Sequence, residues 1–168
     1  NLDKEGLRSI AEDYDLFYID LWGVVHNGVN LYHEAINALN EISKKNKEYV
    51  LLTNAPRPNK TVKLFLKKLG MEDVILEKVF TSGEAALKYL RKKHYTEKFF
   101  HIGPPRDFGL FNDFKKNKIQ NISEAKYLLC TGLFDDHDKE LSYYKTLLKN
   151  EVDKIMICTN PDLIVDRG

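Results

Sequence analysis

The sequence has few cysteines, no excess of one charge and no long apolar run, and each absence excludes a class of protein. Two cysteines among 168 residues are too few for a secreted domain held together by disulfides. Lys and Arg total 26 against 25 for Asp and Glu, so no basic excess indicates nucleic-acid binding. The apolar runs are far shorter than a bilayer span, and the first residues lack the apolar region of a signal peptide. We therefore expect a cytoplasmic protein that binds neither membranes nor nucleic acid.

What is present indicates a globular protein. Hydrophobic residues make up 43% of the chain and charged residues 30%, and 168 residues suit one domain or a domain with a modest insertion. Cys130 and Cys158 both stand in apolar runs typical of strands. We expect them to be buried, inert thiols rather than a disulfide or a metal site.

Strand-like apolar runs alternate with amphipathic segments along the chain. This alternation predicts an α/β fold with a mostly parallel, Rossmann-like sheet and right-handed crossovers. Thr81 and Glu84 have the spacing of a capping box that opens one of the helices. The expected strands are 16–20, 49–53, 79–80, 98–102, 127–133 and 154–159, and the expected helices are 3–12, 33–45, 59–69, 81–93 and 141–148.

The strand at 16–20 ends in Asp20 and is followed at once by a turn that contains glycine. Residues 16–28 read Leu-Phe-Tyr-Ile-Asp-Leu-Trp-Gly-Val-Val-His-Asn-Gly. In open α/β sheets the carboxyl ends of the strands are where ligands bind. A carboxylate there can hold a divalent cation or attack a phosphoryl group, although an isolated aspartate after a strand more often caps a loop.

The wording of residues 20–28 resembles motif I of the haloacid dehalogenase (HAD) superfamily of phosphohydrolases, and most of all its class IIA, NagD-like and pyridoxal-phosphate-phosphatase branch. In that family the first Asp is the nucleophile and forms an aspartyl-phosphate. The second Asp is the general acid and base, and its main-chain carbonyl helps to bind Mg²⁺. Asp20 matches the first position, and Trp22 stands at the second.

Three further segments follow in the order that the family has them. Residues 51–55, Leu-Leu-Thr-Asn-Ala, resemble motif II, in which a Thr or Ser binds the phosphoryl group. Residues 81–85, Thr-Ser-Gly-Glu-Ala, resemble the segment that opens the core helix before the cap insertion. Residues 158–162, Cys-Thr-Asn-Pro-Asp, resemble a cap loop near the substrate entrance. Each segment alone reads as an ordinary turn or helix start, but the ordered set covers nearly the whole chain.

The resemblance implies a Mg²⁺-dependent phosphohydrolase that acts on a small phosphorylated metabolite, such as a sugar phosphate or a nucleotide. It implies residues 1–95 as the first part of the HAD core and 96–168 as an α/β cap domain. The implied roles are Asp20 as nucleophile, Asp20 and the Trp22 carbonyl as metal ligands, and Gly23, Thr53, Asn54, Ala55, Asn160 and Asp162 as substrate-binding residues.

Trp22 favours an alternative to the phosphohydrolase function. Proton transfer by the usual Asp is worth about 10²–10⁴-fold in rate, and an indole cannot supply it because its N–H is not acidic at neutral pH. A homologue that binds phosphorylated metabolites but has lost catalysis therefore stays open, as does a role for His26 in the same turn. A third hypothesis is a phospho-acceptor domain of flavodoxin-like topology, which also uses an Asp at a strand end, although such domains lack the Thr-Asn and cap motifs.

The family's motif III lysine and motif IV acidic residues would come after the cap, beyond residue 168. We therefore expect residues 1–168 to be part of a longer protein and, on their own, to be marginally stable, to bind Mg²⁺ weakly and to show negligible phosphatase activity. Asp135, Asp136 and Asp138 form the one acidic cluster that offers a substitute for motif IV. Because the motif order places them in the cap, we interpret them as a solvated loop.

Overall fold

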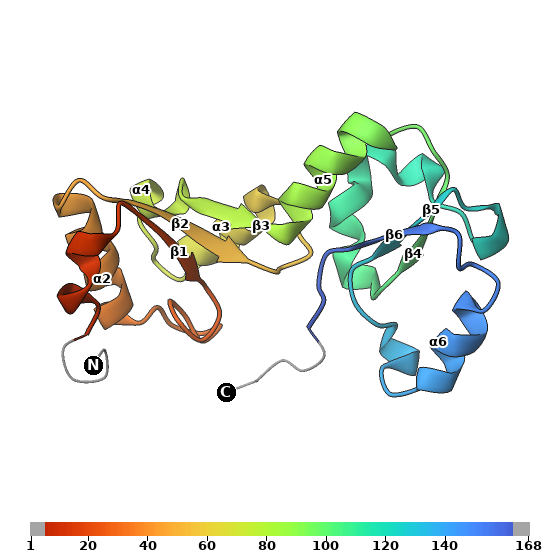
Figure 1. The fold of residues 1–168 in the computed structure, drawn as a ribbon. Coiled ribbons are helices and arrows are strands. Elements are labelled where there is room, and N and C mark those ends of the chain that lie inside the picture. The colour runs from red at the N-terminus through yellow and green to blue at the C-terminus, as the bar shows by residue number, and fades with distance from the viewer. Residues whose placement is uncertain (1–5, 163–168) are drawn as a thin grey trace. The chain divides into compact units, whose positions relative to one another are not determined.

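The computed structural model describes residues 6–162 and divides the chain into two compact units (Figure 1). The first unit holds residues 6–53 together with 59–80. The second holds the loop 54–58 and the described residues from Thr81 onward. Each unit is an α/β structure with its own three-stranded sheet.

The sheet of the first unit has the order β1-β2-β3, with β1 at Leu16–Asp20, β2 at Glu48–Thr53 and β3 at Val79–Thr81. β1 and β2 run parallel, and Asp20 is aligned with Leu52 across the pair. Because both strands point the same way, Asp20 and Thr53 lie at the same carboxyl edge of the sheet.

Three helices accompany this sheet, α2 at His33–Lys44, α3 at Asn59–Lys68 and α4 at Asp73–Leu76. Their apolar positions recur at helical spacing and form one buried stripe on each of the longer helices. Side chains on the face of the sheet away from this core are exposed to solvent, and Tyr18, for example, is 68% exposed. The buried core includes Leu39, Ile42, Tyr49, Leu51, Val62 and Leu66, whereas Leu16, Tyr18 and Leu52 are exposed.

The second unit has the sheet order β4-β5-β6, with β4 at Phe99–Ile102, β5 at Tyr127–Cys130 and β6 at Ile155–Cys158, all parallel. Its helices are α5 at Ser82–Lys93 and α6 at Leu141–Leu148. The amide of Glu84 donates to Thr81 Oγ1 at 2.9 Å, so the predicted cap of α5 is present. These parallel strands joined by helices confirm the expected α/β fold class.

A segment for which the sequence analysis predicted no element completes the core of this unit. Pro105–Asn117 forms a run of 3₁₀ turns that is interrupted at Phe111 and Phe114. Both phenylalanines are almost fully buried and contact Phe99 of β4, with ring centroids 5.2 and 5.5 Å apart. Burying an aromatic ring of this size stabilises the fold by about 1.5–3 kcal/mol. The other members of this core are Leu87, Leu90, Leu110, Tyr127 and Leu129.

Two expectations are wrong. The leading helix is a pair of 3₁₀ turns, Leu7–Ser9 and Ala11–Asp13, and its predicted first residues lie outside the described part of the chain. Cys158 is exposed and Cys130 only half-buried, because Cys158 ends β6, which lies at the edge of its sheet. Burial and the neighbouring Cys158 raise the pKa of the Cys130 thiol to about 11.

No helix within residues 6–162 is long and apolar enough to cross a membrane. The expected boundary near residue 95 between core and cap stays a prediction. In the structure α5, which precedes that position, groups with the later strands.

Candidate active site

Asp20 stands where the sequence analysis expected it, as the last residue of β1. Its side chain is exposed, and Oδ1 accepts a hydrogen bond from the amide of Leu21 at 2.8 Å. The carboxylate is thus oriented by the main chain at the carboxyl edge of the sheet, and Thr53 at the end of β2 lies at the same edge. A carboxylate and a hydroxyl at one edge of a sheet are groups that can take part in phosphoryl transfer.

The turn after Asp20 is held together by main-chain hydrogen bonds. The carbonyl of Leu21 accepts the amides of Val25 at 2.9 Å and His26 at 3.2 Å. Gly23 has a φ of 75°, and its amide donates to the His26 carbonyl at 2.8 Å. That bond and the positive φ make Gly23 part of the shape of the turn, and its predicted role in substrate binding stays a prediction.

The indole of Trp22 is packed within this turn and is 42% exposed. It contacts the ring of His26 edge-to-face, with centroids 5.6 Å apart. It also covers Gly28, where a Cβ would lie 2.9 Å from two atoms of the indole ring. The indole therefore helps to fix the conformation of the turn that follows the candidate nucleophile.

His26 lies buried in the same turn, with its ring against Phe65 of α3 at a centroid distance of 5.6 Å. Its Nδ1 accepts the amide of Gly28 at 3.0 Å, which leaves the proton of the neutral ring on Nε2. Burial lowers the pKa of His26, and the negative charge of Asp20 opposes that shift. His26 therefore sits within the electrostatic reach of Asp20 and packs as part of the turn.

The loop 54–58 is fixed against the start of α5 within the second unit. The Gly83 amide donates to the Ala55 carbonyl at 3.2 Å, and a Cβ on Gly83 would lie 2.4 Å from the main-chain nitrogen of Arg57. Ser82 Oγ lies 3.0 Å from the Ala55 carbonyl oxygen and 2.5 Å from that of Thr159. The Thr-Ser-Gly segment thus joins two loops that the sequence analysis singled out separately.

The loop after β6 meets the loop 54–58 through side chains. The Asn54 amide group donates to the Asp162 carboxylate. The Asp162 main-chain amide in turn donates to Asn160 Oδ1 at 3.2 Å. The structure thus brings together Asn54, Ala55, Asn160 and Asp162, which were predicted from motifs far apart in the sequence, whereas Asp20, Gly23 and Thr53 belong to the first unit.

Sequence reasoning missed a polar cluster in the second unit. His101, Asp107 and Thr131 are each no more than 4% exposed, and His101 Nε2 lies 2.8 Å from Thr131 Oγ1. Asp107 forms an ion pair with Arg57, with Nε and Oδ1 3.6 Å apart. A sequence feature that could have indicated this cluster is Pro-Arg-Pro at 56–58, because the two prolines restrict the backbone around a cationic side chain.

The chemistry of the residues at the edge of β1 suits a hard cation. Mg²⁺ prefers oxygen ligands, and Asp20 is an exposed carboxylate followed two residues later by the Trp22 carbonyl. Residues 6–162 contain no group of three or more His, Cys, Asp or Glu side chains that could hold a metal ion. In the acidic cluster of Asp135, Asp136 and Asp138, Asp135 forms an ion pair with Arg106, with Oδ1 and Nη1 2.5 Å apart.

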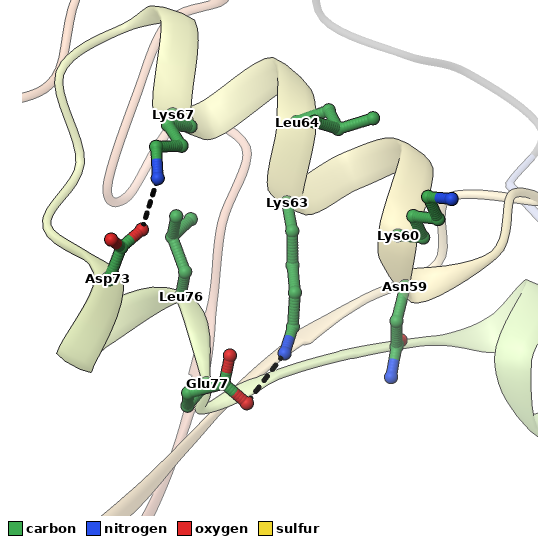
Figure 2. A pocket seen from close by; sticks show the side chains of 8 residues that line it. All are labelled: Asn59, Lys60, Lys63, Leu64, Lys67, Asp73, Leu76 and Glu77. Carbon is green, nitrogen blue, oxygen red and sulfur yellow. Dashed lines mark hydrogen bonds and ion pairs between the residues drawn. The ribbon is translucent and has the colours of Figure 1, made fainter.

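A cavity of about 340 Å³ in the first unit lies between α3 and α4 and includes none of these residues (Figure 2). Two of its three lysines form ion pairs with carboxylates, Lys67 with Asp73 at 2.8 Å and Lys63 with Glu77 at 3.1 Å. These pairs neutralise most of the positive charge that lines the cavity.

Comparisons with known proteins agree with the arrangement of the strands and motifs. A family model described as haloacid dehalogenase-like hydrolase matches residues 17–116. The structure resembles a haloacid dehalogenase-like hydrolase from Brucella suis 1330, with a TM-score of 0.80 and 32% identity over 96% of this chain and 62% of that one. It also resembles NagD from E. coli K-12, with a TM-score of 0.60 and 20% identity over 92% of this chain and 59% of that one.

Among curated proteins, phosphoglycolate phosphatase 2 of Arabidopsis thaliana is 22% identical over 97% of this chain and 61% of its own length. The chain therefore spans about three fifths of the length of the relatives it matches. The family match covers more than half of the chain and confirms the resemblance to the haloacid dehalogenase-like hydrolases. The chain belongs to the haloacid dehalogenase-like hydrolase family.

Proposed function

We propose that this protein is a phosphohydrolase that acts on a small phosphorylated metabolite, with Asp20 as its nucleophile. The observation that carries the proposal is the position of Asp20 at the carboxyl end of β1, aligned with the end of β2 where Thr53 lies. The family membership and the phosphatase named among the relatives support it.

In the proposed reaction a carboxylate oxygen of Asp20 attacks phosphorus. The bond from phosphorus to the leaving oxygen breaks, and the departing alcohol takes up a proton. Water then hydrolyses the aspartyl-phosphate and restores the carboxylate. The hydroxyl of Thr53 donates a hydrogen bond to a phosphoryl oxygen and adds no charge to the site.

Mg²⁺ would be held by Asp20 and the main-chain carbonyl of Trp22. When bound, it neutralises the charge of the phosphoryl oxygens. We propose Gly23, Asn54, Ala55, Asn160 and Asp162 as substrate-binding residues. The contacts that join Asn54 to Asp162 and Asp162 to Asn160 support treating Asn54, Asn160 and Asp162 as one binding surface.

A second candidate function is binding of phosphorylated metabolites without turnover. The observation that favours it is Trp22, whose indole is packed over Gly28 where the family has its general acid and base. An indole in that position cannot protonate the leaving oxygen.

Phosphate release from a panel of esters tests both candidates. The full-length protein is assayed with sugar phosphates, nucleotides and pyridoxal phosphate, with and without Mg²⁺. The proposal predicts turnover that requires Mg²⁺ and is lost in Asp20→Asn. Asp15→Asn, at an exposed position just before β1, is the matched control and should retain activity. Tight binding of an ester without release would support the second candidate, and turnover that survives Asp20→Asn would contradict the first.

A further inference from the structure

The two cysteines of the chain lie opposite each other in the sheet of the second unit. Cys130 is the last residue of β5 and Cys158 the last residue of β6, and the two are register partners in this parallel pair. Residues directly opposite on neighbouring strands point to the same face of a sheet, and the strands lie about 4.8 Å apart. A disulfide needs Cα atoms about 4.4–6.8 Å apart, so this pair meets the distance that a bridge requires.

The two thiols differ in their surroundings, although their side chains are hydrogen-bonded to each other. Cys130 is half-buried and packs against an apolar cluster that holds it in place. The buried members of that cluster are Ile102, Ala125 and Leu128. Cys158 is exposed on β6, the edge strand, where a dissolved oxidant can reach it. One thiol of the pair is therefore fixed, and the other is open to solvent.

The main chain that follows Cys158 is attached to the same place on β5. The amide of Thr159 donates to the carbonyl of Cys130 at 2.9 Å, and the Thr159 hydroxyl donates to the same oxygen at 3.2 Å. The carbonyl oxygen of Thr159 lies 2.5 Å from Ser82 Oγ. A bond between the two sulfur atoms would therefore add a covalent tether at the base of the loop 158–162, beside the hydrogen bonds that already hold it.

We propose that Cys130 and Cys158 are oxidised to a reversible disulfide by small disulfides such as glutathione disulfide, and that this bond tethers the loop 158–162 to the end of β5. A disulfide that includes an exposed cysteine is accessible to reducing thiols, so the bond can be opened again. This modification site does not depend on the proposed phosphohydrolase function, because every residue that forms it belongs to the second unit.

Oxidation takes place in two exchange steps. The thiolate of Cys158 attacks one sulfur of glutathione disulfide, which expels one glutathione thiolate and leaves a mixed disulfide. Cys130 then loses its proton and attacks Sγ of Cys158, which expels the second glutathione. The two protein thiols lose two electrons in total, and one glutathione disulfide is reduced to two thiols. Burial raises the pKa of Cys130 to about 11, which makes it a poor first nucleophile, but its position beside Cys158 favours the second, intramolecular step.

Peptide mapping of the full-length protein tests the proposed bond. The folded protein is incubated with glutathione disulfide, its remaining thiols are blocked, and its peptides are identified by mass spectrometry before and after treatment with dithiothreitol. Hydrogen exchange at the Thr159 amide is measured on the same samples.

The matched control is the double variant Cys158→Ser, Met156→Cys. Met156 is exposed on β6 and is the register partner of Leu128. A cysteine there keeps its access to the oxidant but lies two residues along the strand from the partner of Cys130. The Cα separation from Cys130 becomes about 8 Å, beyond the limit of about 7 Å for a bridge.

We expect the unaltered protein to give two peptides linked through Cys130 and Cys158, which dithiothreitol separates. The double variant should give glutathione mixed disulfides without the link. Exchange at the Thr159 amide should slow about tenfold or more when the bond forms, because a disulfide disfavours local opening of the segment that it closes. The same treatment of Cys158→Ser should leave that exchange unchanged.

A glutathione adduct that persists on Cys158, or two thiols that stay reduced, would overturn the proposed bond. Equal linking in the double variant would overturn it as well, because the link would then not depend on the register of β5 and β6. Unchanged exchange at Thr159 in the linked protein would overturn the tether.

Discussion

The indole of Trp22 covers Gly28 so closely that a Cβ at Gly28 would lie 2.9 Å from two of its ring atoms. This contact holds together the turn that follows Asp20. The ring of His26 packs against the indole and accepts a hydrogen bond from the Gly28 amide. The residue that replaces the family's second Asp is therefore part of the support for the candidate nucleophile. Trp22 cannot carry out the proton transfer of that Asp, and its side chain instead packs within the turn.

Gly28→Ala should destabilise the protein and lower turnover. Gly28 has a φ of 90°, and an L-residue in this left-handed region costs about 1–2 kcal/mol. The new methyl group would also displace the indole. Urea unfolding and kcat measure the two effects. Gly109→Ala is the control because a Cβ there meets nothing within 4 Å. Equal unfolding free energies for the two variants would contradict the role of Gly28 in the turn.

Trp22→Asp should increase turnover of the full-length protein. A carboxyl group two residues after the nucleophile can transfer the proton that an indole cannot, which is worth about 10²–10⁴-fold in rate. Loss of the indole packing lowers stability, by about 1 kcal/mol or more. Trp22→Asn suffers the same loss without gaining an acid, so kcat is compared between these two variants. If Asp and Asn give the same kcat, proton transfer at position 22 does not limit the reaction.

Gly83→Ala should destabilise the protein, although alanine is the better helix former. In an ordinary helix this change stabilises by about 0.5–1 kcal/mol. Here the Cβ would lie 2.4–2.7 Å from three main-chain atoms of Arg57, so the loop 54–58 must shift. Urea unfolding should show a loss of stability where helix propensity predicts a gain. A stabilised Gly83→Ala would disprove the close approach.

His101 should make stability depend on pH. Burial, with a smaller contribution from the charge of Lys118, lowers the pKa of His101 from 6.5 to about 4. Between these values the unfolded chain binds the proton and the folded one does not. Stability is therefore fully present above pH 6.5 and is lost as the pH falls toward 4, by about 3 kcal/mol in total.

His101→Gln should flatten this dependence, and urea unfolding at pH 7 and pH 4.5 measures it. His33→Gln, at an exposed position on α2, is the control and should keep the slope of the unaltered protein. An unchanged slope in His101→Gln would assign the pH dependence to other groups.

Sequence patterns were sufficient for the strands and for the edge of the sheet that carries Asp20 and Thr53. Apolar runs of four to six residues between turn signals mark the parallel strands, although β1 and β6 are largely exposed, and the motif order places the polar residues at the strand ends. The run of 3₁₀ turns at Pro105–Asn117 escaped prediction because its phenylalanines have neither the strand period nor a sustained helical one.

The pairing of Arg57 with Asp107 could not be predicted either. Nothing in the local sequence connects a loop residue of one segment with a carboxylate fifty positions later, and only the packing of the second unit brings them within 3.6 Å. The exposure of Cys158 has a similar cause. Whether an apolar strand is central or lies at the edge of its sheet depends on strand order, which the composition of the strand does not encode.

The central claim is that Asp20 becomes covalently phosphorylated, and trapping the intermediate tests it most directly. The full-length protein is mixed with a turned-over phosphate ester and Mg²⁺, quenched within milliseconds and treated with borohydride, which reduces an aspartyl-phosphate to homoserine. Mass spectrometry of the peptide that contains residues 16–28 then shows which residue has changed. We predict homoserine at position 20, and none there in the absence of the ester. Sustained turnover with position 20 always recovered as unmodified Asp, or with the modification at another carboxylate, would contradict the account.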